Sequence, residues 1–180
     1  MATLHENIGK ELSSKLSDID KAYLAGLFDG EGCVNATIGR RQYFSKREER
    51  EKVSCWGRLQ FVISSKDHLL LELIKTIIGF GKVYRGKKRV YSYRITDRKQ
   101  VLNMVNALIP FVKLKTEYLQ LSRDAVLFML QRKYRSRWSK EELVFFHKEF
   151  VLPLQKLLPS GEKRGRPSQY SFEELLSRCT

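Results

Sequence analysis

The most informative stretch of the 180-residue chain reads Leu24-Ala25-Gly26-Leu27-Phe28-Asp29-Gly30-Glu31-Gly32. Apolar residues at helical spacing lead into this stretch and continue within it, which predicts a helix. Ser17 and Asp18 are the candidate N-cap residues of that helix. The helix is expected to end where the glycines gather. Small residues recur every fourth position, at Ala22, Gly26 and Gly30, so one face of this helix is bare enough for a second helix to approach closely.

Two carboxylates, Asp29 and Glu31, stand at the end of this predicted helix, in a glycine-rich turn. Carboxylates aimed at a DNA phosphate are favourable only where divalent cations lie between the two groups. Such cations assist phosphodiester hydrolysis by activating water and stabilising the leaving oxygen. The alternative is a glycine-terminated helix whose acids only cap or repel, and the spacing alone does not choose between the two.

Hydrophobic periodicity predicts the remaining elements. Alternation through Val34, Ala36 and Ile38 predicts a strand, and a charged turn from Lys46 to Lys52 leads into a second strand through Phe61. Helical spacing returns over 65–78, a second hairpin is expected over 82–96, and helices follow at about 99–109, 115–131, 139–152 and 171–178. This order predicts an α+β fold with an αββαββα core and an antiparallel sheet. The expected division is a polar arm (1–17), a main domain (18–158), and a basic linker with a short helix (159–180).

Composition points to a polyanionic partner. Thirty-four Lys and Arg against 20 Asp and Glu give a formal net charge of +14 and a pI near 9.8, and nucleic acid is the commonest partner of so basic a protein. We expect neither a membrane span nor a secretory signal, and therefore an intracellular, non-secreted protein. Three cysteines without metal-ligand spacing favour a reducing compartment and argue against a disulfide scaffold; Cys33 is interpreted as a packed thiol.

The two hairpins are expected to bind DNA through their polar faces. Long polar side chains suit base edges and phosphates, and an antiparallel ribbon fits the major groove; the alternative is an ordinary solvated sheet face. The predicted contact residues are Asn35, Thr37, Arg41, Tyr43, Trp56, Arg58 and Gln60 on the first hairpin, and Lys82, Tyr84, Lys87, Lys88, Arg89, Ser92 and Arg94 on the second.

The stretch at 24–32 closely resembles the LAGLIDADG signature of homing endonucleases, with Phe28, Gly30 and Glu31 in place of Ile, Ala and Asp. Residues 109–115 resemble the segment that precedes the later helices of that family, and the αββαββα order also matches. The resemblance implies a saddle-shaped DNA-binding sheet with helices packed on its other face. It implies that Glu31 and the Gly30 carbonyl bind Mg²⁺, with Mn²⁺ or Ca²⁺ as alternative occupants. Asp29 corresponds to a structural acid.

The resemblance further implies a catalytic role for Lys115, close to the reacting water, with a generic phosphate contact as the alternative. The match weakens after the second strand, where relatives often place Gln and Arg and this chain has Ser65 and Leu69. Lys66 or His68 is the candidate substitute. Because one motif supplies one active site, the chain is expected to pair as a homodimer, through Ala22, Ala25, Gly26 and Asp29.

Two basic segments lie towards the end of the chain. Residues 163–167 resemble an AT-hook core, which binds a narrow minor groove, and the alternative is a basic flexible linker. The cluster at 132–137 is expected to contact phosphates. The resulting hypothesis is a metal-dependent homing endonuclease that cuts both strands of a long pseudo-palindromic duplex and leaves short 3′ overhangs. Its host would be an organellar or prokaryotic compartment with mobile introns. The alternatives are an intron maturase that binds intron RNA and a DNA-binding protein without cleavage.

Overall fold

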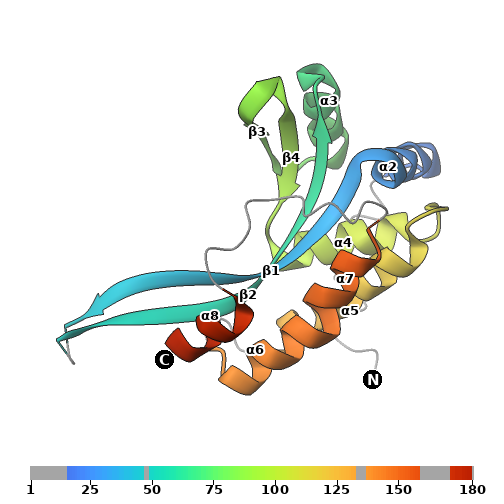
Figure 1. Ribbon diagram of the computed structural model, residues 1–180. Coiled ribbons are helices and arrows are strands. Elements are labelled where there is room, and N and C mark those ends of the chain that lie inside the picture. The colour runs from blue at the N-terminus through green and yellow to red at the C-terminus, as the bar shows by residue number, and fades with distance from the viewer. Residues whose placement is uncertain (1–15, 47–48, 133–136, 159–170, 180) are drawn as a thin grey trace. The chain divides into compact units, whose positions relative to one another are not determined.

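The computed structural model describes residues 16–46, 49–132, 137–158 and 171–179. The described elements follow the predicted αββαββα order, and four antiparallel strands form one sheet in the order β1-β2-β4-β3 (Figure 1). The α+β prediction is therefore confirmed. The chain divides into two compact units, the first with residues up to Asn35 and from Leu59 to Gln131, the second with Ala36–Arg58 and the residues from Arg132 onward.

The first unit contains most of the core. Its helices are α2 (Asp18–Glu31), α3 (His68–Ile78), α4 (Arg98–Leu108) and α5 (Thr116–Gln131). Its strands are the beginning of β1 (Gly32–Ser45), the end of β2 (Arg50–Ser65), β3 (Lys82–Arg85) and β4 (Tyr91–Ile95). Helix α4 packs against α2 and α5, whereas α3 packs against β3 and β4.

Local sequence signals explain where these helices begin. The Ser17 side chain accepts a hydrogen bond from the backbone of Asp20 and so caps α2, as predicted. Asp67 and Asp97 cap α3 and α4 in the same way. The expected helix over 65–78 thus begins three residues later, because Ser65 still belongs to β2. The expected charged turn at 46–52 is shorter than predicted, since β2 already begins at Arg50.

Strand register separates an apolar from a polar sheet face in the first unit. Phe61 lies opposite Ile95, and Ile63 lies opposite Tyr93, all four of them buried. The Phe28 ring of α2 stacks on Phe61 with 5.0 Å between ring centroids. This aromatic contact seats the end of α2 on the sheet, so the residues after Phe28 are held by the core.

The second unit comprises the outer part of the β1–β2 hairpin and the C-terminal helices. The single helix expected at 139–152 is observed as α6 (Lys140–Phe146), a π-helical segment (His147–Val151) and α7 (Leu152–Lys156). Helix α8 (Phe172–Arg178) begins with a capping box formed by Ser171 and Glu174. Phe172 stacks on His147 with 3.7 Å between ring centroids, and burial of this imidazole lowers its pKa.

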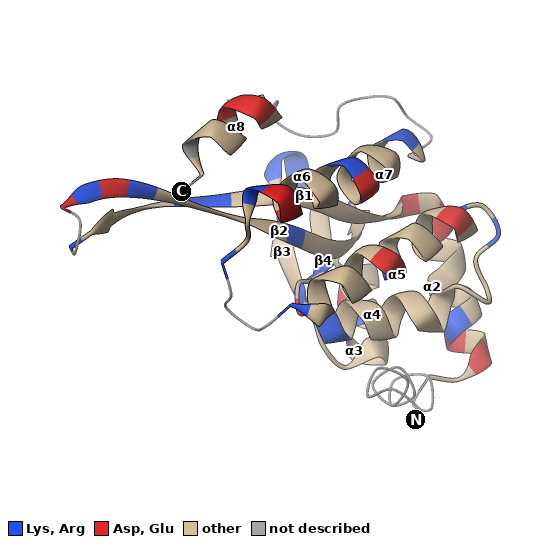
Figure 2. Cartoon of the chain, turned by 90° about the horizontal axis from the view of Figure 1, so that it is seen from below, with Lys and Arg blue, Asp and Glu red and all other residues tan. Residues whose placement is uncertain are grey.

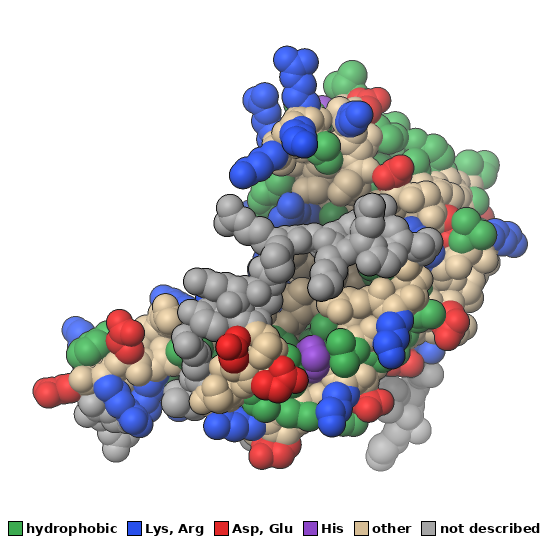
Figure 3. Space-filling model, in the orientation of Figure 1, with side chains coloured by type: hydrophobic (Ala, Val, Ile, Leu, Met, Phe, Trp, Pro, Cys, Tyr) green, Lys and Arg blue, Asp and Glu red, His purple; other side chains and the backbone are tan. Residues whose placement is uncertain are grey.

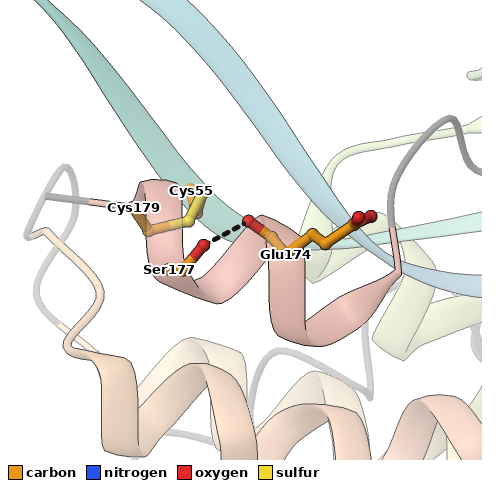
Figure 4. Close-up of a disulfide and its surroundings, with 4 residues drawn as sticks. All are labelled: Cys55, Glu174, Ser177 and Cys179. Atoms are coloured by element: carbon orange, nitrogen blue, oxygen red, sulfur yellow. Dashed lines mark hydrogen bonds between the residues drawn. A yellow bond between two sulfur atoms is a disulfide. The ribbon is translucent and has the colours of Figure 1, made fainter.

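A disulfide joins β2 to the end of α8, contrary to the expectation of a chain without a disulfide scaffold (Figure 4). Cys55 and Cys179 are separated by 124 positions, and their Cα atoms lie 5.9 Å apart. Both are buried in a small cluster with Leu143, against which Val53 and Leu176 pack. The prediction failed because three cysteines allow one pair, and only the tertiary structure shows which two meet.

In the part of the chain that the structure describes, no helix is long and apolar enough to cross a membrane. The arm at 1–15 lies outside the described residues, and the predicted division into arm, domain and linker stays a prediction.

Candidate active site at the end of helix α2

Glu31 is the last residue of α2, and its side chain is exposed. The helix ends at Gly32, where the chain turns into β1. A Cβ atom at Gly32 would overlap the Phe28 ring and lie 2.6 Å from the Phe28 Cα atom. Only glycine permits this close approach, so the residue after Glu31 is fixed by packing against the last turn of α2.

Asp29 is tied to the segment that precedes α5. Its carboxylate accepts hydrogen bonds from the backbone N–H groups of Lys113, Leu114 and Lys115, at 2.8, 3.2 and 3.1 Å. These N–H groups would otherwise have no partner at the start of a helix, and a carboxylate suits the positive end of the α5 dipole. The structural role expected for Asp29 therefore has a physical basis, and its carboxylate is occupied within the chain.

Lys115 approaches the same turn from the other side. Its side chain is buried, and Nζ donates hydrogen bonds to the carbonyl oxygens of Phe28 at 2.9 Å and Gly32 at 2.8 Å. The last turn of α2 contains no basic residue of its own, so Lys115 supplies the cation that stabilises a helix C-terminus. The two carbonyl groups flank Glu31 in the sequence, and the ammonium group therefore holds the backbone on both sides of it.

Tyr118 fixes the beginning of β1, an arrangement that the sequence did not reveal. Its hydroxyl group accepts a hydrogen bond from the Val34 N–H at 2.8 Å and donates one to the Val34 carbonyl at 2.7 Å. Burial raises the pKa of this phenol well above its ordinary value, so it remains a neutral donor and acceptor. Glu31 thus projects from a turn that is held by Asp29, Lys115 and Tyr118.

The donor set at this turn suits a hard divalent cation. Glu31 supplies one exposed carboxylate, and the Gly30 carbonyl is a second candidate oxygen ligand. Among the residues that the structure describes, no group of three or more His, Cys, Asp and Glu side chains could hold a metal ion. Mg²⁺ usually keeps several water ligands and is bound by one or two protein carboxylates together with phosphate oxygens of the substrate. A single carboxylate from each chain is therefore enough for a Mg²⁺ ion that also binds a phosphate.

The β3–β4 hairpin and the end of β2 share a polar face in the first unit. Register places Lys82 opposite Arg94 and Tyr84 opposite Ser92. Arg94 lies over the Tyr84 ring, and its Nε donates to the Ser92 hydroxyl at 2.9 Å. Ser92 is buried. The Ser92 hydroxyl thus already accepts a hydrogen bond from Arg94 within the chain, and the DNA contact expected of Ser92 stays a prediction.

Basic side chains gather over the β3–β4 hairpin (Figure 3). Lys87, Lys88 and Arg89 form its exposed tip. Lys88 and Arg89 have φ values of 54° and 58°, a left-handed conformation that favours glycine over long side chains. The tip thus carries three consecutive cations, two of them in a conformation that costs free energy.

The outer β1–β2 hairpin also presents a polar face. Thr37 and Arg41 are exposed on β1, Tyr43 is half-buried there, and Arg58 is exposed on β2. Charges of both signs follow one another towards the hairpin tip (Figure 2), including Glu49, Arg50 and Glu51. In the first unit, Asn35 is exposed and Gln60 half-buried. The alternation predicted for these strands is confirmed, and the DNA contacts stay predictions.

The face of α2 that carries the small residues is exposed. Ala22 and Gly26 are exposed, and no atom lies within 4 Å of a Cβ built at Gly26. Ile19 and Tyr23 extend this face and are 82% and 43% exposed. Ala25, by contrast, is fully buried in the chain's own core. Ala25 thus presents no surface to a partner chain, whereas Ile19 and Tyr23 do, and the interface itself stays a prediction.

The residues after β2 that stand at or near the positions of the relatives' Gln and Arg have different surroundings. Leu69 is 78% exposed, and Lys66 is also exposed. The His68 ring lies 4.8 Å from the Tyr91 ring, and its Nε2 lies 3.5 Å from a Glu72 oxygen. The predicted basic segment at 163–167 and residues 133–136 of the cluster predicted at 132–137 lie outside the described residues.

Comparisons with known proteins agree with the motif. The family model for LAGLIDADG endonucleases matches residues 24–119. The DNA endonuclease I-CvuI of Chlorella vulgaris is 26% identical over 144 residues, which cover 79% of this chain and 81% of that protein. Its crystal structure with its target and Ca has a TM-score of 0.63 at 18% identity, and the match covers 89% of this chain and 92% of that chain.

Two further structures share the fold. The archaeal intron-encoded homing endonuclease I-Vdi141I, complexed with DNA, has a TM-score of 0.65 at 20% identity over 89% of this chain and 94% of its own. The meganuclease I-SmaMI, bound to uncleaveable DNA, has a TM-score of 0.55 at 16% identity, and the match covers 89% of this chain but 56% of I-SmaMI. Because the family model spans more than half of its residues, this chain belongs to the LAGLIDADG endonuclease family.

Proposed function

We propose that the protein is a divalent-metal-dependent homing endonuclease that hydrolyses both strands of a specific DNA duplex. The observation that carries this proposal is the exposed Glu31 carboxylate, on a turn held on both sides by Asp29 and Lys115. The family membership and the formal net charge of +14 support DNA as the substrate. The DNA-bound relatives agree with this assignment.

In the proposed reaction, Glu31 and the Gly30 carbonyl would hold the cation, which would supply an activated water and stabilise the leaving oxygen. Lys115 keeps the turn in place, and Asp29 keeps Lys115 in place through its backbone. A rigid turn matters because hydrolysis depends on the alignment of water and phosphate, and misplacement by about 1 Å can slow such a step roughly a hundredfold.

The active form is proposed to be a homodimer. Cutting two strands requires two sites, and each chain supplies one motif. The chain covers 92% of I-CvuI but 56% of I-SmaMI, so it corresponds to about half of the longer meganuclease. The exposed face of α2 is apolar at Ile19 and Tyr23, and Gly26 leaves room there for the α2 helix of a second copy to pack closely. A twofold protein would read a pseudo-palindromic target.

The polar faces of the two hairpins are proposed to lie in the DNA major groove. Arginine and glutamine side chains, such as Arg58 and Gln60, are suited to read base edges. The basic tip at Lys87–Arg89 is suited to phosphates. This division assigns sequence preference to the strands and general affinity to the tip.

The test is incubation of the full chain with Mg²⁺ and a library of randomised duplexes, followed by sequencing of the cut ends. The expected result is one enriched pseudo-palindromic site, cut on both strands with short 3′ overhangs, and no cleavage when EDTA replaces Mg²⁺. Enrichment by binding without any cut ends would instead indicate a DNA-binding protein. Preference for intron RNA over every duplex would indicate a maturase. Either outcome would overturn the proposal.

A further inference from the structure

Trp56 lies flat against Gly39 on the outer β1–β2 hairpin. A Cβ atom built at Gly39 would lie 2.8 Å from both Cε2 and Nε1 of Trp56 and 3.1 Å from Cζ2. Cβ atoms essentially never approach a non-bonded atom more closely than 3.0 Å, so the indole occupies the space that a side chain at position 39 would fill. Gly39 on β1 therefore determines how Trp56 on β2 lies.

The indole lies on the polar side of the hairpin. Gly57, the next residue of β2, has the opposite orientation: a Cβ there would meet the rings of Trp138 and Phe146. Cys55 faces this same side and is bonded to Cys179. Because neighbouring strand residues point to opposite faces, Trp56 projects away from these C-terminal groups.

The surroundings of Trp56 are polar and basic. Thr37, Arg41 and Arg58 alternate in phase with Gly39 and Trp56, and all three are exposed. Trp56 itself is half-buried, because part of its ring covers Gly39. It thus offers a flat apolar surface on a face that otherwise presents hydrogen-bond donors and acceptors.

In the major groove, apolar side chains distinguish one feature of the bases, the C5-methyl group of thymine. Donors such as arginine bind guanine and phosphate but gain nothing from that methyl group. We propose that Trp56, held flat by Gly39, is a specificity-determining residue that recognises a thymine methyl group in each half of the DNA target. This inference rests on the proposed function, since it requires a duplex in contact with the hairpin.

An alternative role for the pair is structural. Aromatic residues often cover a glycine on a neighbouring strand and stabilise the sheet. In that case Trp56 would contribute to folding and to binding of all duplexes alike. The two roles differ in what happens when a single methyl group is removed from the DNA.

The experiment uses the duplex selected from the randomised library, with each thymine replaced in turn by deoxyuridine, which lacks only the methyl group. Affinity is measured by titration in Ca²⁺. For the wild-type protein we expect about a fourfold weaker Kd at one thymine per half-site, the effect of one buried methyl group, and no change elsewhere. Trp56→Ala and Gly39→Ala should remove this sensitivity, the second by displacing the indole.

The matched control is Phe44→Ala. Phe44 is an exposed aromatic residue of β1, 61% accessible, whose strand position alternates to the face opposite Gly39; this variant should keep the sensitivity to deoxyuridine. Trp56→Leu provides a second variant if Trp56→Ala folds poorly, and thermal unfolding is recorded for all of them.

Wild-type indifference to deoxyuridine at every position would overturn the inference, as would sensitivity that survives Trp56→Ala. It would equally fail if Trp56→Ala weakened every duplex by the same factor. These results differ from failure of the proposed function, in which the library yields no selected duplex and both proposals fall together.

Discussion

The Asp29 carboxylate and the Lys115 side chain hold the ends of two helices to each other. Asp29 accepts the backbone N–H of Lys115 at 3.1 Å, just before α5 begins. In return, Lys115 Nζ donates to the carbonyl of Phe28, the residue before Asp29, at 2.9 Å. Each charge lies at the helix end whose dipole it stabilises, negative at the start of α5 and positive at the end of α2. Glu31 follows Asp29 by two residues and takes its position from this clamp.

Asp29→Ala should destabilise the fold. The substitution removes the acceptor of three backbone N–H groups, and loss of such charge-assisted capping bonds costs about 2–3 kcal/mol. Asp29→Asn keeps one acceptor oxygen and should cost less. Urea unfolding followed by circular dichroism measures both. Asp124 is an exposed acid on α5, and Asp124→Ala should change the free energy of unfolding by no more than about 0.5 kcal/mol. If Asp124→Ala were as destabilising as Asp29→Ala, the loss of negative charge alone would explain both.

Lys115→Met separates the clamp from a chemical role for the ammonium group. Methionine keeps much of the aliphatic length but leaves two carbonyl groups without this donor, which costs about 2–3 kcal/mol of unfolding free energy. Lys113→Met, at an exposed neighbouring lysine, is the matched control and should be close to neutral. If Lys115→Met unfolded like wild type and yet failed to cut DNA, the ammonium group would act on the reaction and the clamp would contribute little.

Glu31→Gln should abolish cleavage without loss of stability, because the side chain is exposed at the end of α2. DNA affinity should be kept or become tighter, since one negative charge near phosphate is removed. Glu117→Gln removes the same charge from an exposed position on α5 and should cut at the wild-type rate. Gel assays on the selected duplex give cleavage and binding together. Normal cleavage by Glu31→Gln would remove Glu31 from the metal site.

Gly26→Leu tests the proposed dimer. No atom lies within 4 Å of a Cβ at this position, so the isolated chain has room for a larger side chain. At an interface between two α2 helices the same side chain would overlap the partner. The expected product is a folded monomer that cannot make double-strand cuts, because leucine favours a helix interior more than glycine does and so should not unfold α2. Light scattering and circular dichroism report assembly and folding. A dimeric, fully active Gly26→Leu protein would place the interface elsewhere.

Much of the architecture could be predicted because its signals are local. Caps at Ser17 and Asp97 and the alternation of β1 and β2 act within a few residues. The helical pattern also determines on which side of α2 Ala25 lies. Ala25 precedes Phe28 by three residues and follows Leu24, so it belongs to the buried side of α2, whereas Ile19 and Tyr23 accompany Ala22 and Gly26.

What could not be predicted depends on contacts between distant segments. The Lys115 and Tyr118 hydrogen bonds to α2 and β1 span more than 80 positions. Nothing local to either residue indicates such a partner. Ser92 alternates with the polar residues of its strand, yet Arg94 and the neighbouring strands cover it. The pairing of Cys55 with Cys179 is of the same kind, since it depends on where α8 packs.

This disulfide predicts a stability that depends on redox conditions. It closes a loop of more than a hundred residues, and cross-links of this kind typically contribute about 2–4 kcal/mol, mainly by restricting the unfolded chain. Reduction by an excess of dithiothreitol should therefore lower the midpoint of thermal unfolding. Cys55→Ser, Cys179→Ser and the double variant should resemble one another, because each breaks the same bond. Cys33→Ser leaves the bond intact and should keep the sensitivity to reductant.

A thiol count decides whether the bond forms in the isolated protein. Under denaturing, non-reducing conditions the chain should react with one equivalent of a thiol reagent, at Cys33, and with three after reduction. Three reactive thiols before reduction, together with an unfolding midpoint that dithiothreitol does not change, would contradict the pairing. The Cys55–Cys179 contact would then be apolar packing of two thiols against Leu143. In that case α8 would be held by this cluster and by the stacking of Phe172 on His147.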